Sequence, residues 1–585
     1  MKNTEKNKLF PYIILTIIIL LQLVRIVYSF AYLKEDFHSD EIWSFGLSNS
    51  YYEPFVYQSA DHTEQINKDK WVSSEVLKNY ITVNKEQRFD YGSVYFNQVH
   101  DYHPPLYYFI IHTICSLFPD RFSPWNGFIV NIVVFIVTMI YFYNLLFKLT
   151  GTYKSALIGC AFYGFSMSVL NDFVFLRMYC MVTMFAVMSL FYHAKLYKDN
   201  SCNKYIFALF WVTLSGCLTH HFFIPFAGCI SLCFFVYYLL KKNIKLLLAY
   251  SISMLGSVAV SLLVFPATIE HLFSGRIDDS KFTFNWQLIL TLNCVLSELF
   301  GLNLPVGLNI SFGAVAIVIL CLAVIASPLV FLFRNEQWFK KCILFIKNNK
   351  KNLFARFKQA DLMVVSIIVS SLGIIVVTAL TVSFILMQET TDRYLFFIMP
   401  GCSILFILMV SQICGKIIKN PNFKYGLMMI ICVLFCFASN TVSECSYLLQ
   451  KPDDVVSIET LSNDSNCVFI SSEYWLLTCF SKLAMNSDNF WATTDDNLHE
   501  KIDNMSKPPD NEKNMYYFID KRAFYVEPSE NVLDQAMPVM QVGVSNSKKI
   551  KKEEFENTLQ SKYVNFDYVG YDKIFNRDFL IYKVG

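Results

Sequence analysis

The feature that most constrains this sequence is a series of apolar segments, each about as long as a lipid bilayer is thick. A helix needs about 20 predominantly apolar residues to cross the hydrocarbon core. The first segment, 11–33, is too long for a signal-peptide core and lacks a convincing cleavage site, so we expect an uncleaved span. The sequence therefore predicts an all-α polytopic membrane protein with about 11 transmembrane helices. The other ten segments are 127–148, 155–172, 177–197, 204–221, 222–240, 245–268, 309–333, 361–387, 394–414 and 424–443.

The composition agrees with a chain that mostly faces lipid. Hydrophobic residues make up 54% of its 585 residues and charged residues only 16%. With 49 basic and 47 acidic residues the net charge is +2, so the balance does not indicate a nucleic-acid partner. Most of the 17 cysteines lie in apolar runs, where a thiol behaves as a small hydrophobic group, and they imply no metal site.

Lysine and arginine predict the orientation of the chain. They are concentrated in the loops after alternate spans, and the opposite short loops hold almost none. Because basic loops stay in the cytoplasm, we expect a cytoplasmic N-terminus and an extracytoplasmic tail after about residue 444. The membrane we expect is the cell membrane. The basic loops contain Lys148 and Lys154, then Lys195, Lys198 and Lys204, then Lys241, Lys242 and Lys245, then Arg334 to Lys358, then Lys416, Lys419 and Lys424.

Three larger segments are expected outside the membrane: 34–126, 269–308 and the tail. The first ends in HPPLYYFIIHTICSLFP, whose apolar part is too short to span and suggests an interfacial or re-entrant helix. In the tail, CVFIS, NMYYFID and DFLIYKV resemble strands and KKIKKEEFENTLQ is compatible with a helix. We therefore predict a membrane domain, 1–443, which includes the 34–126 loop, and a small α/β domain, 444–585.

An acidic pair, Asp40 and Glu41, follows the first span and is followed at once by Trp43 and Phe45. A carboxylate held among aromatic side chains at a membrane surface is partly desolvated, and this suits a general base. A solvated acidic loop is the other interpretation, and the residues alone leave it open.

A second candidate motif is Asp101-Tyr102-His103, which precedes two prolines that restrict the backbone. A simple turn into the following helix would explain it equally well.

Ionisable groups also lie at the expected outer ends of later spans, where cations suit a lipid phosphate. They stand in the motifs FLRMY, LTHHFF and TTDRYLFFIMP, and each alone could be a snorkelling or capping residue. Arg25 inside the first span is ambiguous in the same way, and Asp278-Asp279 lacks further metal ligands nearby. The candidate residues in these motifs are Arg177, Tyr179, His220, Arg393 and Tyr394.

Together these motifs resemble the C-type integral-membrane glycosyltransferases, in particular the group of protein O-mannosyltransferases and lipid A aminoarabinose transferases (glycosyltransferase family 39). The likeness rests on the acidic pair after the first span, HPPLYY at the end of the first external loop, RMY, the TH pair and RYLFFIMP. It covers about the first 440 residues. Where aminoarabinose transferases carry a lysine before the paired prolines this chain has His103, and its 269–308 loop is too short for the lumenal domain of eukaryotic mannosyltransferases. A bacterial envelope enzyme fits these departures.

The resemblance implies transfer, with inversion, of a hexose or pentose from a polyprenyl-phosphate carrier to an acceptor hydroxyl. Asp40 matches the catalytic acid position and would be the base, with Glu41 beside it. The leaving phosphate needs charge stabilisation rather than a proton, and His103, Arg177, His220 and Arg393 would supply it. The implied partners are the bilayer, the lipid-linked sugar and an envelope lipid, glycopolymer or protein acceptor. No cofactor is implied with certainty, since some family members use a divalent metal and others do not.

Three other functions remain open. A transporter or flippase of a lipid-linked sugar or small solute would also use many spans and buried cations, although paired broken spans in two repeat halves are not evident. A scaffold protein would leave the acidic pair without a purpose. A polymerase or ligase with a diphosphate-linked donor would be expected to carry arginine-dominated external loops, which this sequence lacks.

Overall fold

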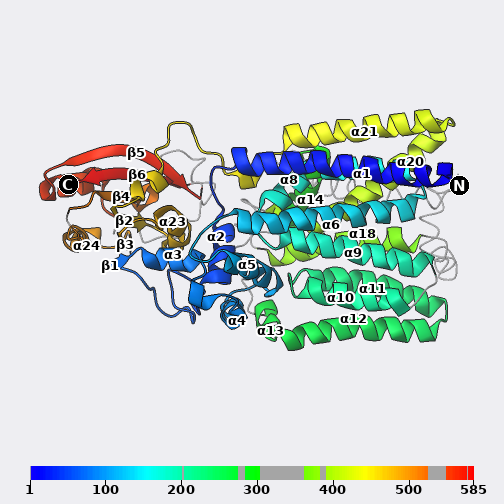
Figure 1. Cartoon of the computed structure of the whole chain (residues 1–585), viewed down its shortest axis with the longest axis horizontal. Helices are drawn as coiled ribbons and strands as arrows, with labels where there is room; N and C mark the ends of the chain where they lie inside the picture. The colour runs from blue at the N-terminus through cyan, green and yellow to red at the C-terminus, as the bar shows by residue number, and fades with distance from the viewer. Residues whose placement is uncertain are drawn as a thin grey trace. The chain divides into compact units, whose positions relative to one another are not determined.

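The computed structural model describes residues 2–199, 203–273, 284–303, 361–382, 391–510, 512–524, 549–575 and 577–585. The chain forms two compact units. The membrane unit contains residues 1–28 and 129–446, and the α/β unit contains residues 29–128 and 447–585. Each unit thus combines an early and a late part of the sequence (Figure 1).

Among the described residues, 8 helices are long and apolar enough to cross a membrane. This confirms the predicted fold class, a polytopic α-helical membrane protein. Leu9–Leu33 is the first candidate span and comprises most of α1 with the π-helical turn that follows it. The helices are α1 (Lys2–Tyr28), α6 (Trp125–Thr150), α9 (Tyr179–Lys198), α11 (Phe223–Leu240), α12 (Ile244–Val264), α18 (Leu362–Thr381), α20 (Met399–Ile417) and α21 (Pro421–Val442).

The remaining three expected spans differ from a simple membrane helix. Segment 155–172 is broken into α7 (Tyr153–Gly164) and α8 (Met167–Val174), which meet at 61°. Segment 204–221 contains α10 (Asn203–Cys217), which is 15 residues long. Segment 309–333 lies outside the described residues.

An apolar helix lies in the segment that we expected to be an external loop. Helix α14 (Phe284–Phe300) packs on α18 and α21 in the membrane unit, after the short helix α13 (Ala267–Phe273). Its 17 residues fall short of the about 20 that a span needs, and therefore the length criterion missed it.

The α/β unit is built on one six-stranded sheet with the order β1-β3-β2-β4-β6-β5. Strands β2, β3 and β4 are parallel, and β1, β5 and β6 are antiparallel to their neighbours. The three strands predicted in the tail are confirmed as β2, β4 and β6. The strands are β1 (Trp71–Ser73), β2 (Asn466–Ser471), β3 (Asn489–Thr494), β4 (Met515–Asp520), β5 (Phe566–Ile574) and β6 (Arg577–Val584).

The first loop and the tail share this sheet, because β1 comes from the loop and pairs with β3 of the tail. Residues 29–128 are therefore grouped with residues 447–585, whereas our prediction had joined 34–126 to the membrane domain. Sequence patterns report short-range order, and a three-residue edge strand supplied from more than 400 positions away leaves no such signal.

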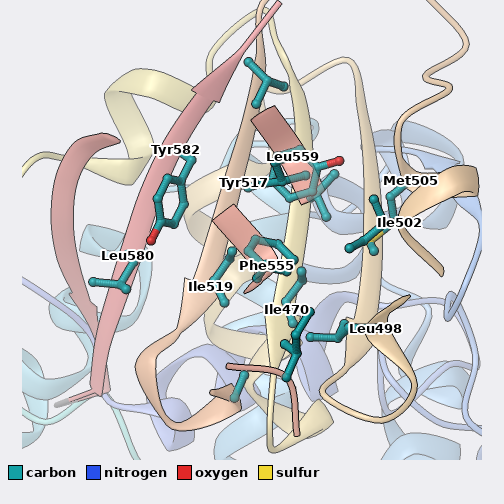
Figure 2. Packing of buried hydrophobic residues seen from close by; sticks show 14 of the residues in the cluster. Ile470, Leu498, Ile502, Met505, Tyr517, Ile519, Phe555, Leu559, Leu580 and Tyr582 are labelled. Carbon is teal, nitrogen blue, oxygen red and sulfur yellow. The ribbon is translucent and has the colours of Figure 1, made fainter. Parts of the chain in front are cut away.

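Helices cover both faces of the sheet. Helices α24 (Leu498–Met505) and α26 (Lys552–Lys562) pack on one face, where Ile470, Tyr517 and Phe555 are buried (Figure 2). On the other face the ring of Phe469 stacks on Phe480 of α23 (Leu477–Ala484), and α22 (Ile458–Ser462) contacts α23. Alternate residues of β2 thus point into two different apolar layers, as the two-residue period of a strand requires.

Four helices from the first loop complete the α/β unit. Helix α2 packs against the other three and against α23 of the tail. The short helix predicted after the paired prolines is present as α5. The bounds are α2 (Ser39–Asn49), α3 (Glu75–Ile81), α4 (Tyr91–His100) and α5 (Leu106–Leu117).

Candidate active site

The acidic pair lies in the first turn of α2, where exposed backbone N–H groups favour negative side chains. His38 is the N-cap, and its Nδ1 accepts a hydrogen bond of 3.1 Å from the backbone N–H of Asp40. The carboxylate of Glu41 accepts one of 2.8 Å from the backbone N–H of His38. These two bonds form a capping box, which fixes the start of the helix. The pair is therefore part of an ordered helix and not of a solvated loop.

The two acids have different surroundings. The Glu41 side chain is 0% exposed and its Oε2 lies 2.9 Å from Nζ of Lys34, which is itself 1% exposed. Lys34 also donates to the carbonyl of Tyr447. The Asp40 side chain is 13% exposed, and its Oδ2 lies 3.9 Å from Nδ1 of His38. Asp40 is thus the more exposed acid of the pair, and Glu41 is the acid that Lys34 and the start of the helix hold in place.

Asp101 and His103 form a second pair in the α/β unit. Nδ1 of His103 lies 2.8 Å from Oδ2 of Asp101, and the two side chains are 20% and 12% exposed. A carboxylate in this position selects the tautomer and orientation of an imidazole. Tyr102, which stands between them in the sequence, is half-buried. The motif follows α4 and leads into α5 through the N-cap Pro105, and both helices pack on α2.

In the membrane unit the structure brings together four predicted residues from three separate segments. The ring of Tyr179 lies 5.3 Å from that of His220 and 6.0 Å from that of Tyr394. The guanidinium of Arg393 lies over the ring of Tyr394 at 5.1 Å, and its Nη2 donates to the hydroxyl at 3.4 Å. Tyr179, His220 and Arg393 are all buried. We call these four residues the Arg393 cluster.

Arg177 lies two residues before Tyr179, in the break between α8 and α9, and is buried. Asn131 of α6 holds this break, because its Nδ2 donates to the carbonyls of Phe173 at 3.0 Å and Phe175 at 2.9 Å. Because α8 ends and α9 begins here, the charged side chain of Arg177 lies between two helices and not inside one continuous helix.

Two buried acids of the membrane unit were missed by the sequence analysis. Asp172 accepts a hydrogen bond of 2.8 Å from the hydroxyl of Thr183, and Glu298 accepts one of 3.4 Å from Nδ2 of Asn171. Both acids are buried. Each stands in an otherwise apolar segment, LNDFVF and VLSELF, and an ionisable residue in such a segment is itself a signal of function or of a specific partner.

Arg25, which was ambiguous in the sequence, contacts protein groups in the membrane unit. Its guanidinium donates to the carbonyls of Phe165 at 2.8 Å and Ser166 at 3.3 Å and to the side chain of Asn440. It thus holds the bend between α7 and α8. Asp278-Asp279 lies outside the described residues. In the part of the chain that the structure describes, no three His, Cys, Asp or Glu side chains are grouped so that they could hold a metal ion.

A buried ion network adjoins the start of α2 in the α/β unit. Nζ of Lys451 lies 2.8 Å from the carboxylate of Asp572 and 3.5 Å from that of Asp36. Burial raises the pKa of Asp36, while Lys451 acts in the opposite direction. Burial alone would lower the pKa of Lys451, but the two carboxylates more than offset this and raise it. Lys451 and Asp572 also line a pocket of about 290 Å³ whose lining is mainly charged.

Comparison with known proteins gives a family match for part of the chain. The family model described as dolichyl-phosphate-mannose-protein mannosyltransferase matches residues 102–269, which is less than a third of the sequence. This range contains Tyr102, His103, Arg177, Tyr179 and His220. No curated protein matches the chain.

Two solved structures align with most of this chain. ArnT from Cupriavidus metallidurans bound to undecaprenyl phosphate aligns with a TM-score of 0.45 and 9% identity over 97% of each chain. The archaeal oligosaccharyltransferase AglB from Archaeoglobus fulgidus, in complex with an inhibitory peptide and a dolichol-phosphate, aligns with a TM-score of 0.45 and 10% identity over 88% of this chain and 70% of AglB. The family resemblance inferred from the motifs is confirmed for residues 102–269, where this chain is similar to the dolichyl-phosphate-mannose-protein mannosyltransferases.

Proposed function

We propose that this protein is a membrane glycosyltransferase that takes a sugar from a polyprenyl-monophosphate carrier and transfers it, with inversion, to an acceptor hydroxyl on the extracytoplasmic face of the cell membrane. The family match over residues 102–269 supports glycosyl transfer. The observation that carries the proposal is the contrast within the acidic pair: the Asp40 side chain keeps 13% of its surface exposed, whereas the Glu41 side chain is 0% exposed and is held by the ion pair with Lys34.

In the proposed reaction the Asp40 carboxylate takes the proton of the acceptor hydroxyl as the acceptor oxygen bonds to the anomeric carbon. The bond between that carbon and the phosphate oxygen breaks on the opposite face, and its electron pair leaves with the polyprenyl phosphate. A base at this position contributes about 10²–10⁴-fold to a rate. Glu41 keeps the helix in place and takes no proton.

The departing phosphate carries its full charge and needs cationic or hydrogen-bond donors rather than an acid. We assign this role to Arg393 and Arg177, with His220 as a further donor. The ring of Tyr394 contacts the Arg393 guanidinium, and Tyr179 packs on both Tyr394 and His220. His103, oriented by Asp101, is a further candidate for this role. A flexible lysine could not replace the fixed arginine fork without loss, because a planar guanidinium pairs with two phosphate oxygens at once.

The donor class can be tested with purified protein in nanodiscs and a panel of radiolabelled polyprenyl-monophosphate and polyprenyl-diphosphate sugars. We expect release of label from one or more monophosphate donors and none from the diphosphates. Arg393→Ala should weaken binding of the active donor by about 10²-fold or more, and Arg393→Lys should weaken it less. Unchanged donor affinity in Arg393→Ala would remove the phosphate role from this residue. Folded protein that releases no label from any donor would favour a transporter of lipid-linked sugars.

A further inference from the structure

The sheet of the α/β unit has a topological switch point at β2, and the proposed reaction assigns no role to the residues there. From β2 the chain passes through α23 to β3 on one side, and later enters β4 on the other side of β2. In open α/β sheets such a reversal opens a crevice beyond the carboxyl end of the central strand, and ligands bind there. The residues that follow β2 and β4 are therefore candidates for a binding site.

Charged side chains meet at this edge of the sheet. The hydroxyls of Ser471 and Ser472 donate to Asp520 at 3.2 and 3.0 Å, where β4 ends. Arg577 lies 3.5 Å from the same carboxylate and 2.5 Å from Oε1 of Glu473. Asp520 is fully buried, whereas the Glu473 side chain remains 22% exposed. A ligand at this edge would meet a carboxylate whose position is fixed by a guanidinium.

Aromatic rings extend this charged array. Nε1 of Trp475 donates to the other carboxylate oxygen of Glu473 at 2.6 Å, and the Arg577 guanidinium lies 5.9 Å from the Trp475 ring. The Trp475 ring contacts Phe575 at 5.5 Å and Trp43 at 5.9 Å. All three rings are half-buried, so part of each remains accessible.

The array ends at the predicted base. Trp43 belongs to α2 and stands three positions after Asp40. Phe575 contacts the ring of His38 at 4.6 Å, and Nδ1 of His38 lies 3.9 Å from the Asp40 carboxylate. Nε1 of Trp43 is buried and finds no acceptor among the described residues. An indole N–H in this state suits a ligand that brings an oxygen acceptor.

We propose that Trp43, Trp475 and Phe575, with Glu473 and Arg577, form an acceptor subsite that binds a saccharide ring. A pyranose has C–H faces that pack on aromatic rings and hydroxyl groups at its edge that pair with carboxylate, guanidinium and indole N–H groups. Apolar and aromatic walls with a few fixed polar groups are what an oriented small ligand requires. The acceptor role of this subsite rests on the proposed function, in which the bound ring carries the hydroxyl that Asp40 deprotonates.

Binding can be measured apart from catalysis, by equilibrium dialysis of the full-length protein in detergent against labelled tetrasaccharides. The probes would be built from glucose, mannose, galactose or N-acetylglucosamine. We expect the native protein to bind at least one of them. Trp475→Ala should weaken that binding about tenfold or more, and Trp475→Phe should weaken it less. Trp71→Phe is a matched control. Trp71 lies on the edge strand β1 and contacts Trp491 of β3, so this substitution should leave saccharide binding unchanged.

Several results would overturn the subsite. Native protein that binds none of the four probes would contradict it, as would Trp475→Ala protein that binds like the native protein. If Trp475→Ala fails to fold, Trp475→Phe and Trp43→Phe decide, and native affinity in both contradicts the proposal. Saccharide binding without sugar transfer would overturn the proposed function and retain the subsite. Sugar transfer without saccharide binding would retain the proposed function and overturn the subsite.

Discussion

Arg25 and Lys34 are nine residues apart in the sequence, belong to different units and are held in different ways. Arg25, in the membrane unit, donates to two backbone carbonyls and an asparagine side chain. Lys34, in the α/β unit, pairs with the buried carboxylate of Glu41 and donates to a backbone carbonyl. The first fixes a bend between helices, and its hydrogen-bond partners among the described residues are neutral. The second fixes the helix that carries the predicted base, so its loss should affect both stability and catalysis.

Lys34→Ala should give the larger loss. It leaves the Glu41 carboxylate buried without its cation, and breaking a buried ion pair in this way costs about 3–5 kcal/mol. We expect a large fall in the melting temperature of the purified protein, together with loss of sugar transfer.

The double variant Lys34→Met with Glu41→Gln provides the control, because it removes both charges and retains an acceptor for the His38 N–H. It should recover much of the stability. A melting temperature as low as that of Lys34→Ala would show that the ion pair is not the source of the effect.

Arg25→Ala should give an intermediate loss. Hydrogen bonds from a charged donor contribute roughly 1.5–3 kcal/mol, and the Phe165 carbonyl keeps its bond from Asn440. Stability should fall while saccharide binding by the remaining folded protein is unchanged, since that site belongs to the α/β unit. Saccharide affinity that falls with Arg25→Ala would contradict this separation of the two units.

The smallest expected effect comes from Lys451 at high pH. Burial opposes but does not cancel the attraction of Asp36 and Asp572, which raises the pKa of Lys451 above its ordinary value of 10.5. A raised pKa in the folded state means that the contribution to stability is complete below 10.5 and is lost as the pH rises through the raised value. Melting temperatures measured from pH 8 upward should therefore decline less in Lys451→Met than in the native protein. Parallel declines would exclude this contribution.

The sequence predicted the elements whose signal is local. The strands β2, β4 and β6 were predicted because each is an apolar run bounded by polar residues, and most spans were predicted by length and hydropathy. Strand β3, with the polar end ATT, strand β5 and the three-residue β1 were missed. The apolar helix α14 was missed because its 17 residues are fewer than the about 20 that a membrane span needs.

The candidate site shows the same division. Asp40, His103 and Arg393 were named because their motifs are local. Besides Glu41, Lys34 contacts the carbonyl of Tyr447, which lies 413 positions away, and no pattern in the sequence connects these two residues. Trp475 and Arg577 come from the tail and carry no motif, so only the folded sheet brings them to α2. Asp172 could have been found, because a carboxylate in an apolar segment is costly unless it has a role or a partner.

The central claim is that Asp40 acts as the base in sugar transfer, and it is tested most directly by the rate of label transfer from the active donor in native protein and in Asp40→Asn. The asparagine keeps the shape of the side chain, so melting temperature and donor binding should stay near those of the native protein. We predict a fall in the transfer rate of about 10²–10⁴-fold. A rate within a few-fold of the native value in well-folded Asp40→Asn protein would contradict the account.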